Sequence, residues 1–266
     1  MLTTQYVPGA PNWLDIGVPD IDAAVAFYGG VFGWTFQSAG PDAGGYGFFQ
    51  LDGKTVAGAG PLTEEGAGAA WTVHFHSPDV DALAKSVEQA GGTVRFGPCD
   101  VFTAGRLAGF TDPTGAEFAV WQPRDVPGLE AIGVSNALSW TELYTTDAAA
   151  AKEFYRTVFA WETADNEMGG NMVYTVASPA GTVPDSNTGH AGLMQLPPEN
   201  RAAGSTSQWH PYFAVEDCDA TVSAATERGA TVVIAPADAE GIGRLAMLVD
   251  PFGAPFALIT PSPRQG

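Results

Sequence analysis

The chain has 266 residues, 45% of them hydrophobic and 15% charged, so we expect it to fold throughout and to be long enough for two domains of ordinary size. Its 30 acidic residues outnumber its 11 basic ones, and the formal charge of −19 repels nucleic-acid phosphates and anionic membranes, which excludes both as expected partners. Most of this charge is expected on a solvated surface, with a weak preference for a cationic ligand.

The first predicted unit begins with a short strand from Trp13 to Val18, followed by a helix that Asp20 can cap. The second begins with a strand from Trp71 to His76, followed by a helix capped by Asp79 or Ser77 and closed by two glycines. Short strands follow each helix. The predicted plan is therefore βαβββ, twice in the first half of the chain.

The same plan returns in the second half. The segment Trp13-Leu14-Asp15-Ile16 reappears as Trp140-Thr141-Glu142-Leu143, 127 residues later, whereas Arg106-Leu107-Ala108 reappears as Arg244-Leu245-Ala246, 138 residues later. The second copy must therefore contain an insertion, which we place in a longer surface loop rich in Gly, Ser, Asn and Pro between Trp161 and Trp209.

Proline and glycine between the copies indicate a linker. We predict a first domain over residues 8–123, a linker over 124–136 and a second domain over 137–262. No run of about 18 apolar residues occurs, and the first residues lack a basic segment followed by an apolar stretch, so we expect a cytoplasmic protein. Cys99 and Cys218 form no CxxC pair and are expected to be reduced thiols.

Two motifs recur in both halves. A "D…FY…F-x-W" element follows the first strand of each copy, from Asp20 to Trp34 and from Asp147 to Trp161, and a "D-P-x-G-x-x-F" element precedes the last strand at Asp112 and Asp250. In this duplicated order they resemble the vicinal-oxygen-chelate superfamily of glyoxalases, bleomycin-resistance proteins and extradiol dioxygenases. The resemblance covers nearly the whole chain. It implies an α+β fold of tandem glyoxalase-like domains, with four βαβββ modules whose curved mixed sheets surround cavities.

Side chains alternate across a strand, which sorts each predicted strand into a helix-side face and a concave face. Trp34, Trp71, Trp161 and Trp209 are expected in the core. The concave faces are expected to carry the three remaining tryptophans, two tyrosines and several ionisable residues, namely Trp13, Asp15, His74, His76, Glu117, Trp121, Trp140, Glu142, Tyr144, His210 and Tyr212.

Metal enzymes of this superfamily carry a His or Glu at three positions that correspond to Trp13, Thr72 and Ala119 in the first copy and to Trp140, His210 and Ala257 in the second. Only His210 is a metal-ligand residue type, and one ligand does not hold a divalent ion, so we expect no metal site of the family type. A displaced site would have to use residues such as Asp15, His74, His76 and Glu117, which are otherwise interpreted as polar residues of a wet cleft. No nucleotide-binding glycine loop or nucleophile elbow occurs, and no cofactor is expected.

The leading hypothesis is a metal-free binding protein that holds a hydrophobic aromatic ligand, such as an antibiotic or a biosynthetic intermediate. Trp13, Trp121, Trp140, Tyr144 and Tyr212 would stack on the ligand, and Asp15 and Glu142 would pair with a ligand amine. Alternatively, the indoles simply fill the cavities.

A second hypothesis is a metal-independent isomerase, lyase or oxygenation-pathway enzyme. Asp15 or Glu142 would then act as general base, and His74, His76 or His210 as acid. A metal-dependent lyase or dioxygenase ranks third. The sequence does not specify the ligand or which copy is functional. It also does not specify how the modules pair or whether the protein is a monomer or a homodimer.

Overall fold

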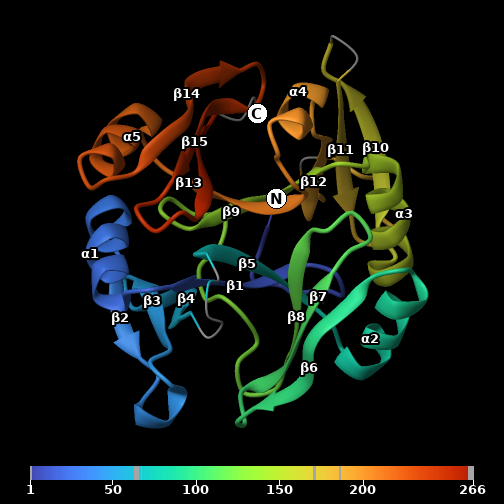
Figure 1. Cartoon of the computed structure of the whole chain (residues 1–266), viewed down its shortest axis with the longest axis horizontal. Helices are drawn as coiled ribbons and strands as arrows, with labels where there is room; N and C mark the ends of the chain where they lie inside the picture. Colours follow the sequence, from blue (N-terminus) through green and yellow to red (C-terminus); the bar gives the residue numbers. More distant parts are fainter. Residues whose placement is uncertain (1, 63–65, 67, 170–171, 186, 263–266) are drawn as a thin grey trace. The chain divides into compact units, whose positions relative to one another are not determined.

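A computed structural model describes residues 2–62, 66, 68–169, 172–185 and 187–262. Its strands form two mixed sheets, in the order β2-β3-β4-β1-β5-β8-β7-β6 for the first half of the chain and β10-β11-β12-β9-β13-β16-β15-β14 for the second (Figure 1). Each half repeats the predicted βαβββ module twice, so the predicted α+β fold is confirmed.

In the first half the elements are β1 (Pro11–Val18), α1 (Ile21–Phe32), β2 (Thr35–Ser38), a 3₁₀ turn (Pro41–Ala43), β3 (Gly47–Leu51), β4 (Lys54–Pro61), β5 (Ala70–His76), α2 (Val80–Gln89), β6 (Thr93–Val101), β7 (Gly105–Thr111) and β8 (Glu117–Pro123). In the second half they are β9 (Leu138–Thr145), α3 (Ala148–Phe159), β10 (Glu162–Glu167), β11 (Val173–Ser178), β12 (Ala191–Gln195), α4 (Pro198–Ala202), β13 (Gln208–Ala214), α5 (Cys218–Thr226), β14 (Thr231–Ala239), β15 (Gly243–Val249) and β16 (Pro255–Pro261).

The extra length of the second copy lies mainly between β11 and β12. Residues 179–190 connect these strands, whereas only Asp52 and Gly53 connect their counterparts β3 and β4. The short helix α4 occupies the following connection. The insertion predicted between Trp161 and Trp209 therefore falls in loops, as expected.

An aspartate begins each of the four module helices, because its carboxylate accepts a hydrogen bond from a backbone N–H of the first turn. Asp20 caps α1 as predicted. At α2 the cap is Asp79, and the hydroxyl of Ser77 accepts a hydrogen bond from the backbone N–H of Asp79 instead.

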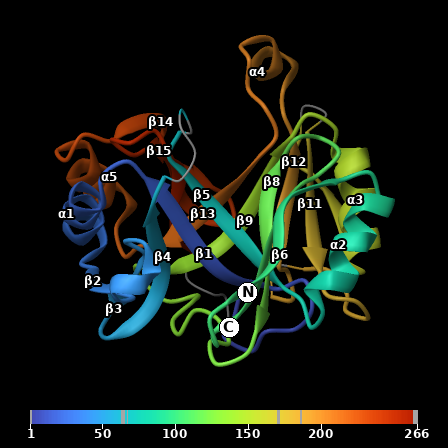
Figure 2. The ribbon, with the colours of Figure 1, turned by 60° about the horizontal axis from the view of Figure 1, so that its bottom comes forward.

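The chain divides into two compact units that cut across the two copies. Unit one contains residues up to 13, 72–128 and 140–210, and therefore combines the second and third modules. Unit two contains residues 14–71, 129–139 and those from 211 onward, and combines the first and fourth modules. Within unit one α2 packs on α3, and within unit two α1 packs on α5 (Figure 2).

The repeated motifs meet inside each unit. In unit one the hydroxyl of Tyr155 donates to Oδ2 of Asp112 at 3.0 Å and accepts from Nε1 of Trp209 at 2.9 Å. In unit two the hydroxyl of Tyr28 donates to Oδ2 of Asp250 at 2.6 Å. The other carboxylate oxygen of each aspartate accepts backbone N–H groups of its own turn. The aspartate of the "D-P-x-G" motif thus both shapes a turn and bonds a tyrosine from the other copy.

The four tryptophans expected in the core are buried there, Trp34 and Trp71 in unit two and Trp161 and Trp209 in unit one. In each unit the two tryptophan rings contact each other and a buried phenylalanine or tyrosine, at centroid distances of about 5–6.5 Å, a common geometry for aromatic pairs.

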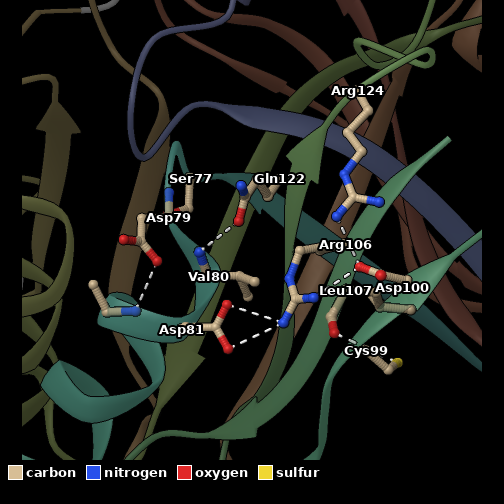
Figure 3. A network of polar contacts seen from close by, with 11 residues as sticks. Ser77, Asp79, Val80, Asp81, Cys99, Asp100, Arg106, Leu107, Gln122 and Arg124 are labelled. Carbon is tan, nitrogen blue, oxygen red and sulfur yellow. Dashed lines mark hydrogen bonds and ion pairs between the residues drawn. The ribbon is translucent and has the colours of Figure 1, made fainter. Parts of the chain in front are cut away.

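A second repeated contact is ionic and lies at the surface. The Arg106 guanidinium bridges Asp81 on α2 and Asp100 on β6, at 2.9 and 2.8 Å, and Arg124 also contacts Asp100 (Figure 3). In the second copy Arg244 contacts Asp219 and Asp238 in the same way. Because half or more of each aspartate side chain is exposed, these pairs are expected to contribute little to the stability of the fold.

Both cysteines are free thiols, Cys99 exposed and Cys218 buried. Burial raises the pKa of Cys218 to about 11, so this thiol stays protonated and unreactive. Among the described residues, no helix is long and apolar enough to cross a membrane.

Candidate functional site

The strand β9 carries three predicted site residues at alternate positions, and all three lie in unit one. Glu142 is buried, with 4% of its surface exposed, whereas Trp140 and Tyr144 on either side of it are half-buried. Strand β12 runs parallel to β9 and places Gly192 opposite Glu142. A buried carboxylate is thus flanked along its strand by two aromatic rings that stay partly accessible.

Tyr174 on β11 completes this group. Nε1 of Trp140 donates to the Tyr174 hydroxyl at 2.8 Å, and the Glu142 side chain lies close enough to this hydroxyl to affect its pKa. Burial, together with the negative charge of Glu142, raises the pKa of Tyr174 well above its ordinary value. The phenol therefore remains a proton donor at any physiological pH.

Gly192 makes the position of Tyr174 possible. A Cβ atom at residue 192 would collide with the Tyr174 hydroxyl oxygen and its Cζ atom, so only glycine leaves room for this hydroxyl. We call Trp140, Glu142, Tyr174 and Gly192 the carboxylate cluster.

The first copy repeats this arrangement in unit two. The Tyr46 hydroxyl donates to Oδ2 of Asp15 at 3.2 Å, and Gly58 on β4 lies opposite Asp15 in the parallel register. A Cβ atom at Gly58 would collide with the Tyr46 hydroxyl, just as one at Gly192 would with Tyr174. A carboxylate, a tyrosine and a glycine thus recur together in both copies.

Neither tyrosine was predicted from the sequence. Tyr46 precedes the second strand after the helix and Tyr174 lies within its counterpart, where no strong motif anchors the alignment of the copies. A signal existed nonetheless, since Tyr174 follows Tyr46 by 128 residues, close to the offset of 127 that relates Glu142 to Asp15.

His210 on β13 also belongs to unit one and contacts Tyr144 edge to face, with ring centroids 5.1 Å apart. Burial lowers the pKa of His210 to about 4, so its imidazole is neutral near pH 7. Unit one therefore contains four of the predicted site residues of the second copy, namely Trp140, Glu142, Tyr144 and His210. The fifth, Tyr212, lies in unit two and is 7% exposed.

In the first copy Trp13 and Trp121 pack against each other. Their rings are stacked with centroids 6.5 Å apart, each residue is 7% exposed, and Nε1 of Trp121 donates to the backbone oxygen of Val126 at 2.8 Å. These indoles contribute to packing and offer little free surface. The structure thus favours, for this pair, the interpretation that the indoles fill space.

The remaining predicted polar residues are spread out. His74 is buried and lies opposite Ala119, and His76 is half-buried opposite Trp121, with its pKa lowered by burial. Glu117 is exposed rather than directed into a cleft, and it forms an ion pair with Arg95 at 3.0 Å.

His190 ends the long loop before β12 and is buried, which lowers its pKa to about 4. It lines a pocket of about 180 Å³ beside Gln5 and Asn187.

A metal site of the family type does not fit these residues. The positions that correspond to the family ligands are occupied by Trp13, Thr72 and Ala119 and by Trp140, His210 and Ala257, which supply one imidazole in total. In the part of the chain that the structure describes, no three His, Cys, Asp or Glu side chains are grouped so that they could hold an ion.

Comparison with known proteins places both copies in one family. The sequence model of the Glyoxalase/Bleomycin resistance protein/Dioxygenase superfamily matches residues 10–120, and that of the glyoxalase-like domain matches residues 140–259. The anthracycline biosynthesis protein DnrV of Streptomyces peucetius is 41% identical over 271 residues, which cover 96% of this chain and 94% of that protein. The anthracycline biosynthesis protein DauV of Streptomyces sp. strain C5 matches with the same identity and coverage.

Solved structures share the fold at lower identity. The Mn(II)-bound glyoxalase from Novosphingobium aromaticivorans is 21% identical, with a TM-score of 0.63 over 96% of this chain and 83% of that chain. The 2,2',3-trihydroxybiphenyl 1,2-dioxygenase from Sphingomonas wittichii is 14% identical, with a TM-score of 0.65 over 96% of this chain and 91% of that chain. At such identities these likenesses describe the fold and carry no information on the reaction.

Proposed function

Because the chain belongs to the superfamily of glyoxalases, bleomycin resistance proteins and dioxygenases, we propose that it binds a hydrophobic aromatic small molecule of secondary metabolism without a metal ion. The role would be resistance, sequestration or assistance to a biosynthetic step. The two relatives named for anthracycline biosynthesis support the metabolic setting. The carboxylate cluster, with Tyr144 beside it, is the observation that carries the proposal.

The chemistry of this face suits a flat ligand with a polar group. Trp140, Tyr144 and Tyr174 are half-buried, and aromatic rings provide large stacking surfaces at low entropic cost. Glu142 supplies a buried carboxyl group among them. Binding sites for small molecules typically combine such apolar surface with a few polar groups that orient the ligand.

A direct binding measurement tests the proposal. Daunorubicin, an anthracycline, is titrated into the protein by isothermal calorimetry, with quenching of tryptophan fluorescence as a second readout. We expect saturable binding, weakened about tenfold by Trp140→Leu because one stacking surface is lost. Phe102→Ala is the matched control, since Phe102 is an aromatic residue of the same unit that is 69% exposed. The absence of heat and quenching up to millimolar daunorubicin would contradict the proposal.

One observation also favours a metal-independent enzyme. The buried Glu142 lies near Tyr174, whose raised pKa keeps the phenol protonated, so a carboxyl group and a proton donor are neighbours. In such an enzyme Glu142, or Asp15 in the first copy, would remove a proton from a bound substrate. Incubation of aromatic intermediates with the parent, Asp15→Asn and Glu142→Gln proteins, followed by mass spectrometry, tests this assignment. Equal turnover by all three would eliminate it.

A metal-dependent lyase or dioxygenase remains the third candidate, although the residue types do not favour it. Elemental analysis of the purified protein, and ligand binding before and after treatment with EDTA, distinguish it from the other two. A stoichiometric divalent metal whose removal abolishes binding or turnover would establish this candidate instead.

A further inference from the structure

We propose that the strands of the fourth module, in unit two, carry a binding surface for an uncharged fused aromatic ring system. This surface is the face of β13, β14, β15 and β16 that points away from α1, and we call it the open face. Its residues are Tyr212, Ala214, Ile234, Ala237, Leu245, Met247, Ala257 and Ile259. The inference rests on the proposed function, because it assumes a ligand of the same class and adds a second surface that contacts it.

The register of the strands defines this face. Residues that lie opposite each other in neighbouring strands point to the same side of the sheet. The alternate residues Phe213 and Phe256 mark the core side, because both contact Phe32 of α1, with ring centroids 5.0 and 6.2 Å apart. Two rows of opposite residues then cross the open face, one of Ile234, Met247, Ala257 and Tyr212 and one of Ala237, Leu245, Ile259 and Ala214.

The open face carries no residue type that is charged at neutral pH, although the whole chain is strongly acidic. The four strands contain two charged residues, Asp238 and Arg244, which form an ion pair at 3.1 Å. Both alternate with residues of the open face, and Arg244 also contacts Asp219 on α5, so they point to the helix side. An uncharged ring system can therefore cover the open face without removing water from an ion.

Accessibility distinguishes the open face from its counterpart in the second module. Gly109, the counterpart of Met247, is buried, and the Phe96 ring lies over it, since a Cβ atom at this glycine would collide with that ring. In the fourth module Met247 is half-buried instead, and Ile234, at the position of Phe96, is 49% exposed. The open face therefore keeps apolar surface that the second module covers with its own side chain.

The chemistry of the two modules differs on the same face. The second module carries two imidazoles and a carboxylate there, on His74, His76 and Glu117. The residues 138 positions later are uncharged, namely Tyr212, Ala214 and Pro255. Of the two modules, only the fourth thus offers a face without ionisable imidazole or carboxyl groups, which favours an uncharged ligand over an ionic one.

The size of the open face fits several fused rings better than a single ring. Four strands at a spacing of about 4.8 Å span about 14 Å, and the two rows extend about 7 Å along the strands. Met247 and Ile259 lie near its centre, and a flexible thioether side chain adapts well to a flat aromatic surface.

A charge introduced on the open face tests the inference. Daunomycinone, the uncharged tetracyclic aglycone of daunorubicin, is titrated into the whole protein, and quenching of tryptophan fluorescence reports its affinity. We expect Ile234→Glu to weaken binding about tenfold or more, because the ring system would have to remove water from the new carboxylate. Val232→Glu is the matched control on the same strand, since Val232 lies opposite the buried Leu248 and therefore points to the other face. Its affinity should stay within about twofold of the parent.

Met247→Ala is a second variant, which removes the side chain near the centre of the face and should weaken daunomycinone binding severalfold. It decides the matter should Ile234→Glu fail to fold, as judged by circular dichroism. Parental affinity in both variants, or equal weakening by Val232→Glu, overturns the inference.

Two further outcomes also overturn it. One is a parent protein that binds daunorubicin but not daunomycinone. The other, seen by light scattering, is a parent dimer that Ile234→Glu converts to a monomer without a change in affinity, because the face would then hold a second copy of this chain. Each of these results leaves the proposed function intact, whereas failure of the parent to bind either probe would contradict the proposed function itself.

Discussion

The Tyr28 hydroxyl donates a 2.6 Å hydrogen bond to Oδ2 of Asp250, which lies 222 residues further along the chain. Tyr28 belongs to the "FY" motif of the first module and Asp250 to the "D-P-x-G" motif of the fourth. Tyr155 and Asp112 make the equivalent bond between the third and second modules. Both pairs are buried, so the most recognisable residues of the sequence stabilise the joining of modules from different copies.

Removal of the Tyr28 hydroxyl should destabilise the protein. Tyr28→Phe leaves a buried carboxylate oxygen without its donor, and we expect a loss of about 1–3 kcal/mol in the free energy of unfolding, measured by urea denaturation at pH 7. Tyr155→Phe should behave similarly. Ser86→Ala is the control, because the Ser86 hydroxyl bonds its own helix at an exposed position. Equal stability of all variants would show that the two buried bonds contribute nothing net.

The isolated copies should not fold as monomers. Fragments 1–133 and 134–266, divided near the exposed Val134, each lack the modules that complete both compact units. We expect each fragment alone to aggregate, self-associate or remain unfolded, and an equimolar mixture to recover the circular dichroism spectrum of the whole chain. Size-exclusion chromatography with light scattering checks this. A folded, monomeric first fragment would contradict the observed pairing of modules.

Acidification should destabilise the protein through its buried histidines. The pKa of His210 falls from 6.5 to about 4 on folding because burial disfavours the imidazolium, so between these values the unfolded chain binds more protons than the folded one. The contribution is therefore fully present above pH 6.5 and is lost as the pH falls towards 4.

At pH 5 the loss for His210 is on the order of 2 kcal/mol relative to pH 7.5. Urea denaturation at both pH values measures it, and His210→Gln, which cannot be protonated, should reduce the pH dependence by that amount. Identical pH dependence of the parent and the variant would show that His210 already titrates normally in the folded protein.

The two halves should respond differently to loss of an indole N–H. Trp121→Phe removes a partly buried hydrogen bond to Val126 and reduces the packing on Trp13, so it should lower stability by about 1–3 kcal/mol and leave daunorubicin affinity unchanged. Trp140→Phe affects a half-buried ring and the bond to Tyr174, so it should weaken ligand binding with little effect on stability. Reversed results would place the ligand at Trp121 instead.

Local sequence patterns were sufficient to predict the modules. Helix caps such as Asp20 and the helical spacing of residues such as Phe27 and Tyr28 act within a few residues. Because the chain is a repeat, each of these patterns occurs in both copies. The association of the first module with the fourth could not be predicted in this way, because Tyr28 and Asp250 are conspicuous in their own segments but nothing local specifies that they meet.

The candidate site could be predicted only in part, because local patterns do not show which side chains meet across strands. Alternation along β9 correctly placed Glu142 between two aromatic side chains. Tyr174 escaped notice because its importance depends on a hydrogen bond across strands, and because the glycine that permits this bond, Gly192, carries no recognisable chemistry of its own. Trp13 and Trp121 were assigned to the concave face from alternation alone, which does not reveal that the two rings would pack on each other.

The division of the chain into units that cross the copies also limits how the copies can diverge. A substitution in the helix-side core of one copy alters the packing of a unit that the other copy shares, so core changes in the two halves must remain mutually compatible. Asp15, by contrast, accepts its hydrogen bond from Tyr46 of its own copy, and Glu142 lies beside Tyr174 of its own copy. A gene duplicated in this manner can therefore specialise one half for a new ligand while both halves continue to depend on each other for folding.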